Sequence, residues 1–282
     1  MKVNIIYPKD GWYLQHTAEE LIKRLDAEHR AIFSFRAALK RTACALLRKP
    51  CTDIASFEVS SGSDKTVNYY INYHLFKRKT PDIDVGHFTH PEPDGEFDNV
   101  ARQVDFAVCM SERYAAYLRE KGITHCRQIM PGLDGFFRPK LVLGWFGRFS
   151  YYGDRKGKGL FDKVRELDFV DLRQYADLQR EQLAEAYREC DYVLITSKYE
   201  GGPMSLLEGI GCGKKIICPP DVGLAAEFPE AVIPYENSDW DSLHKALKSL
   251  YGEKERTASL VSGYTWDRFY QEHMRLFREL AG

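Results

Sequence analysis

The chain has 282 residues, a formal net charge of -1 at pH 7 and an apolar fraction of 44%. This length allows one large domain or two of ordinary size, and the apolar fraction is typical of a globular protein. Because the net charge is close to zero, no overall field attracts the chain to nucleic acid, and a nucleic-acid partner is not expected.

The cysteines and the apolar runs bear on the cellular compartment. Seven cysteines are scattered along the chain without a C-x-x-C pair. This predicts reduced thiols in a cytoplasmic protein and argues against a disulfide framework or a zinc site. The longest apolar runs have the length of strands, so the sequence predicts neither a signal peptide nor a membrane-spanning helix.

Strands and helices alternate along the first half of the chain. Apolar runs predict strands at residues 3–7, 67–76, 85–88, 106–109 and 128–130. Helical spacing predicts helices at residues 17–28 and 112–121, the second with Ser111 as its N-cap and Gly122 at its end. This alternation predicts an α/β fold with parallel sheets covered by helices on both faces.

Residues 36–49 form a basic segment, which begins with Arg36, ends with Lys49 and contains no acidic residue. Leucines and alanines within it can form an apolar stripe along a helix. A basic amphipathic helix of this kind can lie on an anionic membrane surface. A solvated helix that packs on the protein's own core is the alternative interpretation.

A strand predicted at residues 141–146 ends in a loop that carries two cations. Gly147 and Arg148 follow the strand directly, and Lys156 lies in the glycine-rich stretch after it. Open α/β sheets bind ligands at the carboxyl ends of their strands. Arginine offers a planar fork to phosphate oxygens and lysine a compact charge, so the pair can neutralise a diphosphate without a metal. A solvated basic loop is the alternative.

The next predicted strand, residues 192–197, leads into a glycine-rich turn and a helix. This segment consists of Glu200, Gly201, Gly202, Pro203, Met204, Ser205, Leu206, Leu207 and Glu208. The glycines let a ligand approach the backbone, Pro203 suits the first turn of a helix, and the free amides of that turn attract an anion. Glu208, about 7.5 Å further along the helix, can reach hydroxyls of a group attached to that anion. Glu200 would face the other side of the anion. A plain strand–turn–helix unit with two solvated glutamates is the alternative.

Together these pieces resemble the retaining, nucleotide-sugar-dependent glycosyltransferases of family 4, which have the GT-B fold. The resemblance rests on five segments in the family's order: Pro131 to Pro139, Gly147-Arg148 with Lys156-Gly157, Glu200 to Glu208 as the E-x₇-E motif, Asp221-Val222-Gly223, and Tyr264-Thr265-Trp266 with the helix after it. It is strong over residues 131–282 and weaker but collinear over residues 1–130.

The resemblance implies a fold of two Rossmann-like domains whose parallel sheets face a cleft. The N-terminal acceptor domain would span residues 1–137 and the donor domain residues 138–265. The C-terminal helix, residues 266–282, would cross back to the N-terminal domain. Residues 131–139 are the expected hinge. Between Leu160 and Tyr175 there is room for only one short helix and one short strand, so a shortened member of the family is expected.

The resemblance also implies roles for the residues of the donor site. Arg148, Lys156 and the amides from Gly202 to Ser205 would hold the diphosphate. Glu208 would hold the ribose, and Glu200 the hydroxyls of the donor sugar.

On the acceptor side, His90 would line the reacting face, and Gly11 would lie in a loop that faces the cleft. A polar loop histidine and a simple turn glycine are the alternatives.

Two other patterns invite a metal-site interpretation. Asp82 and Asp84 form a D-x-D pair, which binds metal in glycosyltransferases of the GT-A fold, but here the pair precedes an apolar run and is expected to be a strand's polar entry. His87 and His90 with Glu92 could also suggest a metal, yet histidine pairs of this spacing are common in loops. No metal is expected.

The function implied is that of a metal-independent, hexosyltransferase-type enzyme without a cofactor. It would move a sugar from a UDP- or GDP-sugar to a glycan or lipid-linked acceptor with retention, in surface glycan or polysaccharide biosynthesis. It would act in the cytoplasm, or at the inner face of the membrane through residues 36–49. A nucleotide-sugar epimerase of the same fold and a catalytically silent nucleotide-sugar-binding protein are the alternatives. A dinucleotide dehydrogenase is disfavoured, because no G-x-G-x-x-G follows the first strand. The base, sugar, acceptor, linkage and oligomeric state stay open.

Overall fold

The computed structural model of the protein describes residues 1–9, 12–32, 51–149 and 154–282. Gly11 and the basic segment 36–49 lie outside the described residues. The chain divides into two compact units: unit 1 is Met1–Gly135 with Val261–Gly282, and unit 2 is Phe136–Leu260. The boundaries expected from the sequence, after residues 137 and 265, lie a few residues further along the chain.

The described part of unit 1 is built on a seven-stranded sheet of order β2-β3-β1-β4-β5-β6-β7. Its strands are β1 (Lys2–Lys9), β2 (Arg30–Ile32), β3 (Cys51–Glu58), β4 (Thr66–Tyr70), β5 (Ile83–Phe88), β6 (Phe106–Cys109) and β7 (Cys126–Gln128). In the part of the sheet ordered β1-β4-β5-β6-β7, each strand is parallel to its neighbours.

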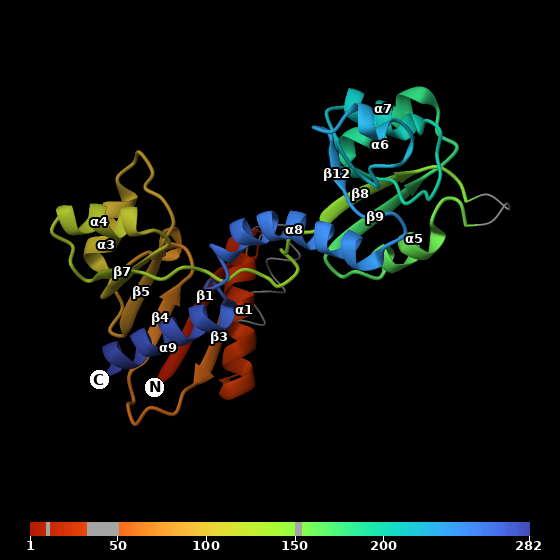
Figure 1. Ribbon diagram of the computed structural model, residues 1–282. Coiled ribbons are helices and arrows are strands. Elements are labelled where there is room, and N and C mark those ends of the chain that lie inside the picture. The colour runs from red at the N-terminus through yellow and green to blue at the C-terminus, as the bar shows by residue number, and fades with distance from the viewer. Residues whose placement is uncertain (10–11, 33–50, 150–153) are drawn as a thin grey trace. The chain divides into compact units, whose positions relative to one another are not determined.

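Helices cover both faces of this sheet (Figure 1). On one face lie α1 (Tyr13–Glu28) and α9 (Trp266–Ala281), and on the other α3 (Glu96–Gln103) and α4 (Glu112–Glu120). Successive side chains of a strand point to opposite faces. Accordingly Val3 and Ile5 pack with α1 and α9, whereas Ile6 packs in the cluster with α3 and α4. The α/β class with parallel sheets and a C-terminal helix on the N-terminal unit is therefore confirmed.

Three details of unit 1 differ from the sequence-based prediction. Strand β3, next to the edge strand β2, runs antiparallel to both of its neighbours, so the sheet is mixed on this side. The strand predicted at 67–76 ends at Tyr70, because the Asn72 side chain accepts a bond from the His74 amide and starts the 3₁₀ turn η1 (Tyr73–Leu75). The strand predicted at 128–130 is instead β7, whose pairing with β6 starts at Cys126.

A fully buried hydrogen-bonded chain joins α9 to the sheet. His273 Nδ1 lies 2.8 Å from the Phe269 carbonyl oxygen and must donate to it, so Nε2 accepts from the Tyr69 hydroxyl at 2.7 Å. The Tyr69 oxygen then accepts from His87 Nδ1 at 2.8 Å. Burial lowers the pKa of His87 to about 4 and that of His273 to about 3. Both imidazoles are therefore neutral at ordinary pH.

Unit 2 contains a five-stranded parallel sheet of order β12-β11-β10-β8-β9 within the described residues. Its strands are β8 (Leu141–Phe146), β9 (Val170–Tyr175), β10 (Tyr192–Leu194), β11 (Lys215–Cys218) and β12 (Val232–Pro234). One face packs against α5 (Lys158–Arg165) and α8 (Trp240–Ser259). The other packs against α6 (Arg180–Glu189), α7 (Met204–Gly211) and the 3₁₀ turn η2 (Gly223–Glu227).

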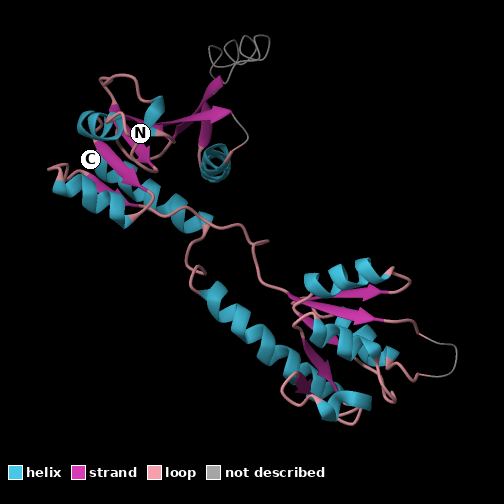
Figure 2. Ribbon diagram, turned by 90° about the horizontal axis from the view of Figure 1, so that it is seen from above, coloured by secondary structure: helices cyan, strands magenta, loops and turns pink. Residues whose placement is uncertain are grey.

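This three-layer arrangement is visible in Figure 2, where helices flank the strands of unit 2 on both sides. Between Leu160 and Tyr175 the chain forms only the rest of α5 and strand β9, as the sequence predicted, and β9 lies at the edge of the sheet.

No helix within the described residues is long and apolar enough to cross a membrane.

Candidate functional site

A pocket of about 380 Å³ lies in unit 2 where β8 and β9 end and α7 begins. This is the carboxyl edge of a parallel sheet, where α/β proteins bind ligands. Seven of the predicted donor-binding residues line it, namely Gly147, Arg148, Lys156, Pro203, Met204, Ser205 and Glu208. The structure therefore brings together residues that are up to 61 positions apart (208 − 147 = 61).

The carboxyl ends of β8 and β9 bring a cation and a carboxylate into contact. The Gly147 amide donates to the Tyr175 carbonyl oxygen at 2.9 Å, which ties the two strand ends together. Directly after them, the Arg148 guanidinium pairs with the Asp177 carboxylate. Both side chains are more than half exposed, at 72% and 59%, so the pair is open to an incoming ligand.

Close packing at Gly157 positions Lys156. Gly157 has a φ of +66°, and a Cβ there would lie 1.9 Å from the Thr196 carbonyl oxygen, so no other residue fits without rearrangement. The Thr196 hydroxyl donates to the Lys156 carbonyl oxygen at 2.6 Å. These contacts bring Lys156 to the end of β10, where its ammonium group pairs with Glu200.

Glu200 is held in place as an anion. Its carboxylate accepts from the Ser197 hydroxyl at 3.1 Å and pairs with Lys156 and, at 3.3 Å, with Arg155. Burial alone would raise the pKa of Glu200, but the Lys156 ammonium, the Arg155 charge and the Ser197 hydrogen bond outweigh it and hold that pKa below its ordinary value. An ionised, fixed carboxylate of this kind is a strong acceptor for hydroxyl groups.

The turn from Glu200 into α7 leaves backbone amides free. Pro203 occupies the N-cap position with φ −66° and ψ 115°, so it lies one residue before the first helical turn in which it was predicted. The amides of Met204 and Ser205 then open the helix, where no intrahelical acceptor is available for them. Gly223 packs against this turn: a Cβ there would lie 2.7 Å from Pro203 Cδ.

Glu208 is oriented by α6. Its carboxylate accepts from the Tyr187 hydroxyl at 2.9 Å and pairs with Arg180 at 3.3 Å. Burial, and then the contact with Glu208, raise the pKa of Tyr187, which therefore stays protonated and donates. The Tyr187 ring stacks on Phe146 with centroids 3.7 Å apart, so the wall of the pocket fixes the carboxylate.

Residues 149–262 match the model of a family described as glycosyl transferases group 1. The match covers 114 of the 282 residues (149–262). The predicted resemblance is thereby confirmed for the segment that contains Lys156, Glu200 and Glu208. A comparison with curated proteins found no match.

Solved glycosyltransferase structures are similar to the chain at low identity. A mutant of S. aureus TarM in complex with fondaparinux, α-GlcNAc-glycerol and UDP is 12% identical over 75% of this chain and 55% of its own, with a TM-score of 0.31. Sucrose-phosphate synthase of Thermosynechococcus elongatus is 15% identical over 93% of this chain and 79% of its own, with a TM-score of 0.32. Anabaena HepE in complex with UDP is 14% identical over 76% of this chain and 78% of its own, with a TM-score of 0.30. At these values the likenesses assign no substrate to this chain.

The residues predicted on the acceptor side lie in unit 1. His90 lies there with its side chain 62% exposed, and its Nε2 is 3.0 Å from Glu92 Oε1. His87 is buried and bonded to Tyr69, so it does not form a pair with His90 at the surface. Asp84 lies inside β5, fully buried, and its carboxylate accepts from the Thr80 amide at 2.8 Å. The described residues contain no group of three or more metal-binding side chains.

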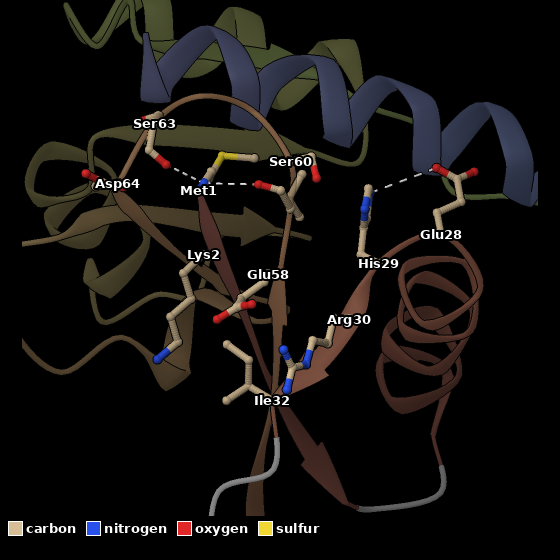
Figure 3. Close-up of a pocket in the computed structure, with 11 residues that line it drawn as sticks. Met1, Lys2, Glu28, His29, Arg30, Ile32, Glu58, Ser60, Ser63 and Asp64 are labelled. Atoms are coloured by element: carbon tan, nitrogen blue, oxygen red, sulfur yellow. Dashed lines mark hydrogen bonds and ion pairs between the residues drawn. The ribbon is translucent and has the colours of Figure 1, made fainter.

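A second pocket, of about 500 Å³, lies in unit 1 beside the start of β1 (Figure 3). The Met1 amino group donates to the carbonyl oxygens of Val59 and Ser63 there. His29 and Glu28 form a weak pair at 4.0 Å on its rim. None of the predicted site residues lines this pocket, and it lies at the amino end of β1, away from the carboxyl edge where ligands of α/β sheets bind.

Proposed function

We propose that the protein is a retaining glycosyltransferase that moves a sugar from a nucleoside-diphosphate sugar to an acceptor hydroxyl. One observation carries the proposal: two cations, the start of α7 and a fixed carboxylate line a single pocket of about 380 Å³. A nucleoside diphosphate presents the complementary groups, two phosphates next to a ribose with two hydroxyls.

The diphosphate would be held without a metal. Arg148 offers a planar fork of donors, Lys156 a compact charge, and the amides of Met204 and Ser205 the positive end of the α7 dipole. Such fixed groups stabilise the negative charge that develops on a diphosphate as it leaves. Metal independence follows from this arrangement as part of the proposal.

The two glutamates would bind hydroxyls on either side of the diphosphate. Glu208, fixed by Tyr187, would accept from the ribose hydroxyls. Glu200, fixed by Lys156 and Ser197, would accept from hydroxyls of the donor sugar. Both side chains are mostly buried, at 19% and 10% exposed, so their hydrogen bonds are little weakened by water.

In the proposed reaction, the acceptor oxygen bonds to the anomeric carbon as the bond from that carbon to the phosphate oxygen breaks. Both events occur on the same face of the sugar, which gives retention. The leaving phosphate oxygen takes the acceptor proton, so no separate protein base is required. His90 as a residue of the reacting face, the membrane contact through residues 36–49, the cytoplasmic location and the polysaccharide pathway stay predictions.

Calorimetric titration of UDP, GDP and ADP, with and without magnesium, tests the donor site. We expect one diphosphate to bind without the metal, and Glu208→Ala to weaken binding at least about tenfold, since hydrogen bonds to a charged group contribute about 1.5–3 kcal/mol. Glu185→Ala is the matched control, because Glu185 is an exposed glutamate on α6 that pairs with Arg188 and does not line the pocket. Equal binding by both variants would refute the site.

Product analysis separates the alternatives. A glycosyltransferase releases little free sugar without acceptor and forms a new glycoside with one, in the donor's anomeric configuration. An epimerase converts the nucleotide-sugar without acceptor, and a silent binding protein yields neither product. NMR of the reaction mixture with an acceptor pool distinguishes these three results.

A further inference from the structure

Both cations that line the donor pocket are already paired with a carboxylate. Arg148 contacts Asp177 and Lys156 contacts Glu200, while Arg180, outside the pocket lining, contacts Glu208 at 3.3 Å. The charged side chains that line the pocket, Arg148 and Lys156 with Asp177 and Glu208, cancel in formal charge. A nucleoside diphosphate therefore enters a neutral pocket, and it gains a full ion pair only if it takes a cation from its carboxylate.

The three pairs differ in how firmly the carboxylate is held. Glu200 and Glu208 are mostly buried. Glu200 also accepts a hydrogen bond from the Ser197 hydroxyl, and Glu208 one from the Tyr187 hydroxyl. Asp177 is 59% exposed, and within the described residues neither it nor Arg148 has a second ion-pair partner. An exposed ion pair contributes little to stability, because water screens it and both side chains must be held in place. The Arg148–Asp177 pair is thus the one that opens at the least cost.

The backbone holds Asp177 in an unusual conformation beside Arg148. Asp177 has a φ of +62° and is one of only two non-glycine residues with positive φ in the described chain. Aspartate and asparagine tolerate this region better than other residues with a Cβ. Asparagine can therefore replace Asp177 with the same shape and backbone, and removes only the charge.

We propose that Asp177 is an internal counter-ion that occupies Arg148 in the empty donor pocket and is displaced by the diphosphate. This role rests on the proposed function. Within that function, Asp177 sets the affinity of the pocket for the donor and for the nucleoside-diphosphate product. When the product leaves, Asp177 pairs with Arg148 again. The exchange lowers the cost of release, because Arg148 is not left without a partner.

Titration of UDP, GDP and ADP into four variants tests this role. Asp177→Asn is expected to bind the preferred diphosphate about three- to tenfold more tightly than wild type, since the ligand no longer competes with a carboxylate near Arg148. In stopped-flow displacement the gain should lie mainly in slower dissociation, as is usual among variants of one site. Asp171→Asn is the matched control, because this carboxylate lies on β9, the strand that leads to Asp177, pairs with Arg173 and does not line the pocket.

A double-mutant cycle tests whether Asp177 affects diphosphate binding through Arg148. In an Arg148→Gln background, Asp177→Asn should tighten binding by less than about twofold, because no guanidinium is left to release. If wild type and Asp177→Asn bind equally, or if the gain persists in full without Arg148, the counter-ion role is wrong while the donor site stands. If no variant binds UDP, GDP or ADP, the proposed function and this role both fall.

Discussion

Tyr187 contacts two other residues that line the donor pocket, Glu208 and Phe146. Its hydroxyl donates to Glu208 at 2.9 Å while its ring stacks on Phe146, which in turn stacks on Tyr175 with centroids 5.0 Å apart. One side chain therefore links the aromatic wall of the pocket to the carboxylate proposed to bind ribose.

Removing this hydroxyl should weaken nucleotide binding without disturbing the stack. We expect Tyr187→Phe to raise the Kd for the preferred diphosphate about three- to tenfold and to lower the free energy of unfolding by about 1 kcal/mol. Tyr192→Phe is the control, since it removes a tyrosine hydroxyl from β10 of the same unit at a residue that does not line the pocket. Calorimetry and urea unfolding of both variants measure the two effects. Unchanged affinity in Tyr187→Phe would show that Glu208 is oriented by other groups.

The strand–turn–helix segment of this site was predictable from the sequence, since a glycine turn between a strand and a helix leaves few geometries. Of its residues, Pro203, Met204, Ser205 and Glu208 line the pocket and Glu200 does not; their roles in donor binding stay predictions. The contact between Tyr187 and Glu208 was missed, because these residues are 21 positions apart and are joined by packing of α6 on α7. The pairing of Arg148 with Asp177 was missed for the same reason, because it depends on the register of β8 against β9.

At the scale of elements, α9 is attached to unit 1 by apolar packing around a polar chain. Phe269 and Phe277 lie in the core with β1 and β4 residues. Within that core His273 bonds to Tyr69, and Tyr69 to His87. Burial removes both imidazoles from water, and the charge of Arg127 also opposes a proton on His273, so a proton on either histidine would be costly.

The stability of unit 1 should therefore fall in mild acid. The folded-state pKa values of His87 and His273, about 4 and about 3, lie below the value of 6.5 for an exposed histidine. Below pH 6.5 the two histidines bind protons in the unfolded chain but stay neutral in the folded chain. The free energy of unfolding therefore decreases as the pH falls toward 4. Each histidine contributes a slope of about 1.4 kcal/mol per pH unit at most.

Urea unfolding at pH 7, 6 and 5, followed by tryptophan fluorescence, measures this slope. His273→Gln should reduce it by about half, since one of the two titrating groups is gone, although the variant is less stable at every pH. His90→Gln, in an exposed loop, is the control and should keep the wild-type slope. A slope that is the same in all three proteins would refute the role of the buried chain.

The helices and parallel strands that were predicted have local patterns, whereas β3, α3, α8, β11 and β12 were not predicted. Residues 51–58 carry no regular alternation of apolar and polar side chains, and the strand is defined by antiparallel pairing with β1. The break at Asn72 was hidden inside an apolar run, since only its side-chain bond to the His74 amide shows that the strand has ended. Such features depend on tertiary pairing or on a single cap, which composition does not reveal.

At the scale of the whole molecule, the chain leaves unit 1 after Gly135 and returns to it at Val261. The segments next to these two points contact each other within unit 1. The Leu133 amide donates to the Tyr264 carbonyl oxygen at 2.8 Å, and Asp134 accepts from Trp266 Nε1 at 2.8 Å. A Cβ on Gly132 would lie 2.3 Å from the Trp266 amide nitrogen. The expected hinge at 131–139 is thus packed against the start of α9 up to Gly135, and the boundary between the units follows directly after it.

Unit 2 is continuous in sequence and contains the whole candidate donor pocket. It has its own cores on both faces of its sheet, and the residues that line the pocket all lie between 146 and 208. A domain with its own core can fold alone. We therefore expect a fragment of residues 136–260 to fold and to bind the preferred nucleoside diphosphate within about twofold of the full chain.

The fragment should not transfer sugar, because the acceptor groups that the function requires are assigned to unit 1. Circular dichroism first establishes that the fragment is folded, and calorimetry and a transfer assay then compare it with the full chain. The Glu208→Ala variant of the fragment is the control, since it should lose the same affinity as it does in the full chain. A folded fragment that binds no diphosphate would mean that unit 1 supplies part of the donor site, and the proposal that unit 2 alone recognises the nucleotide would be wrong.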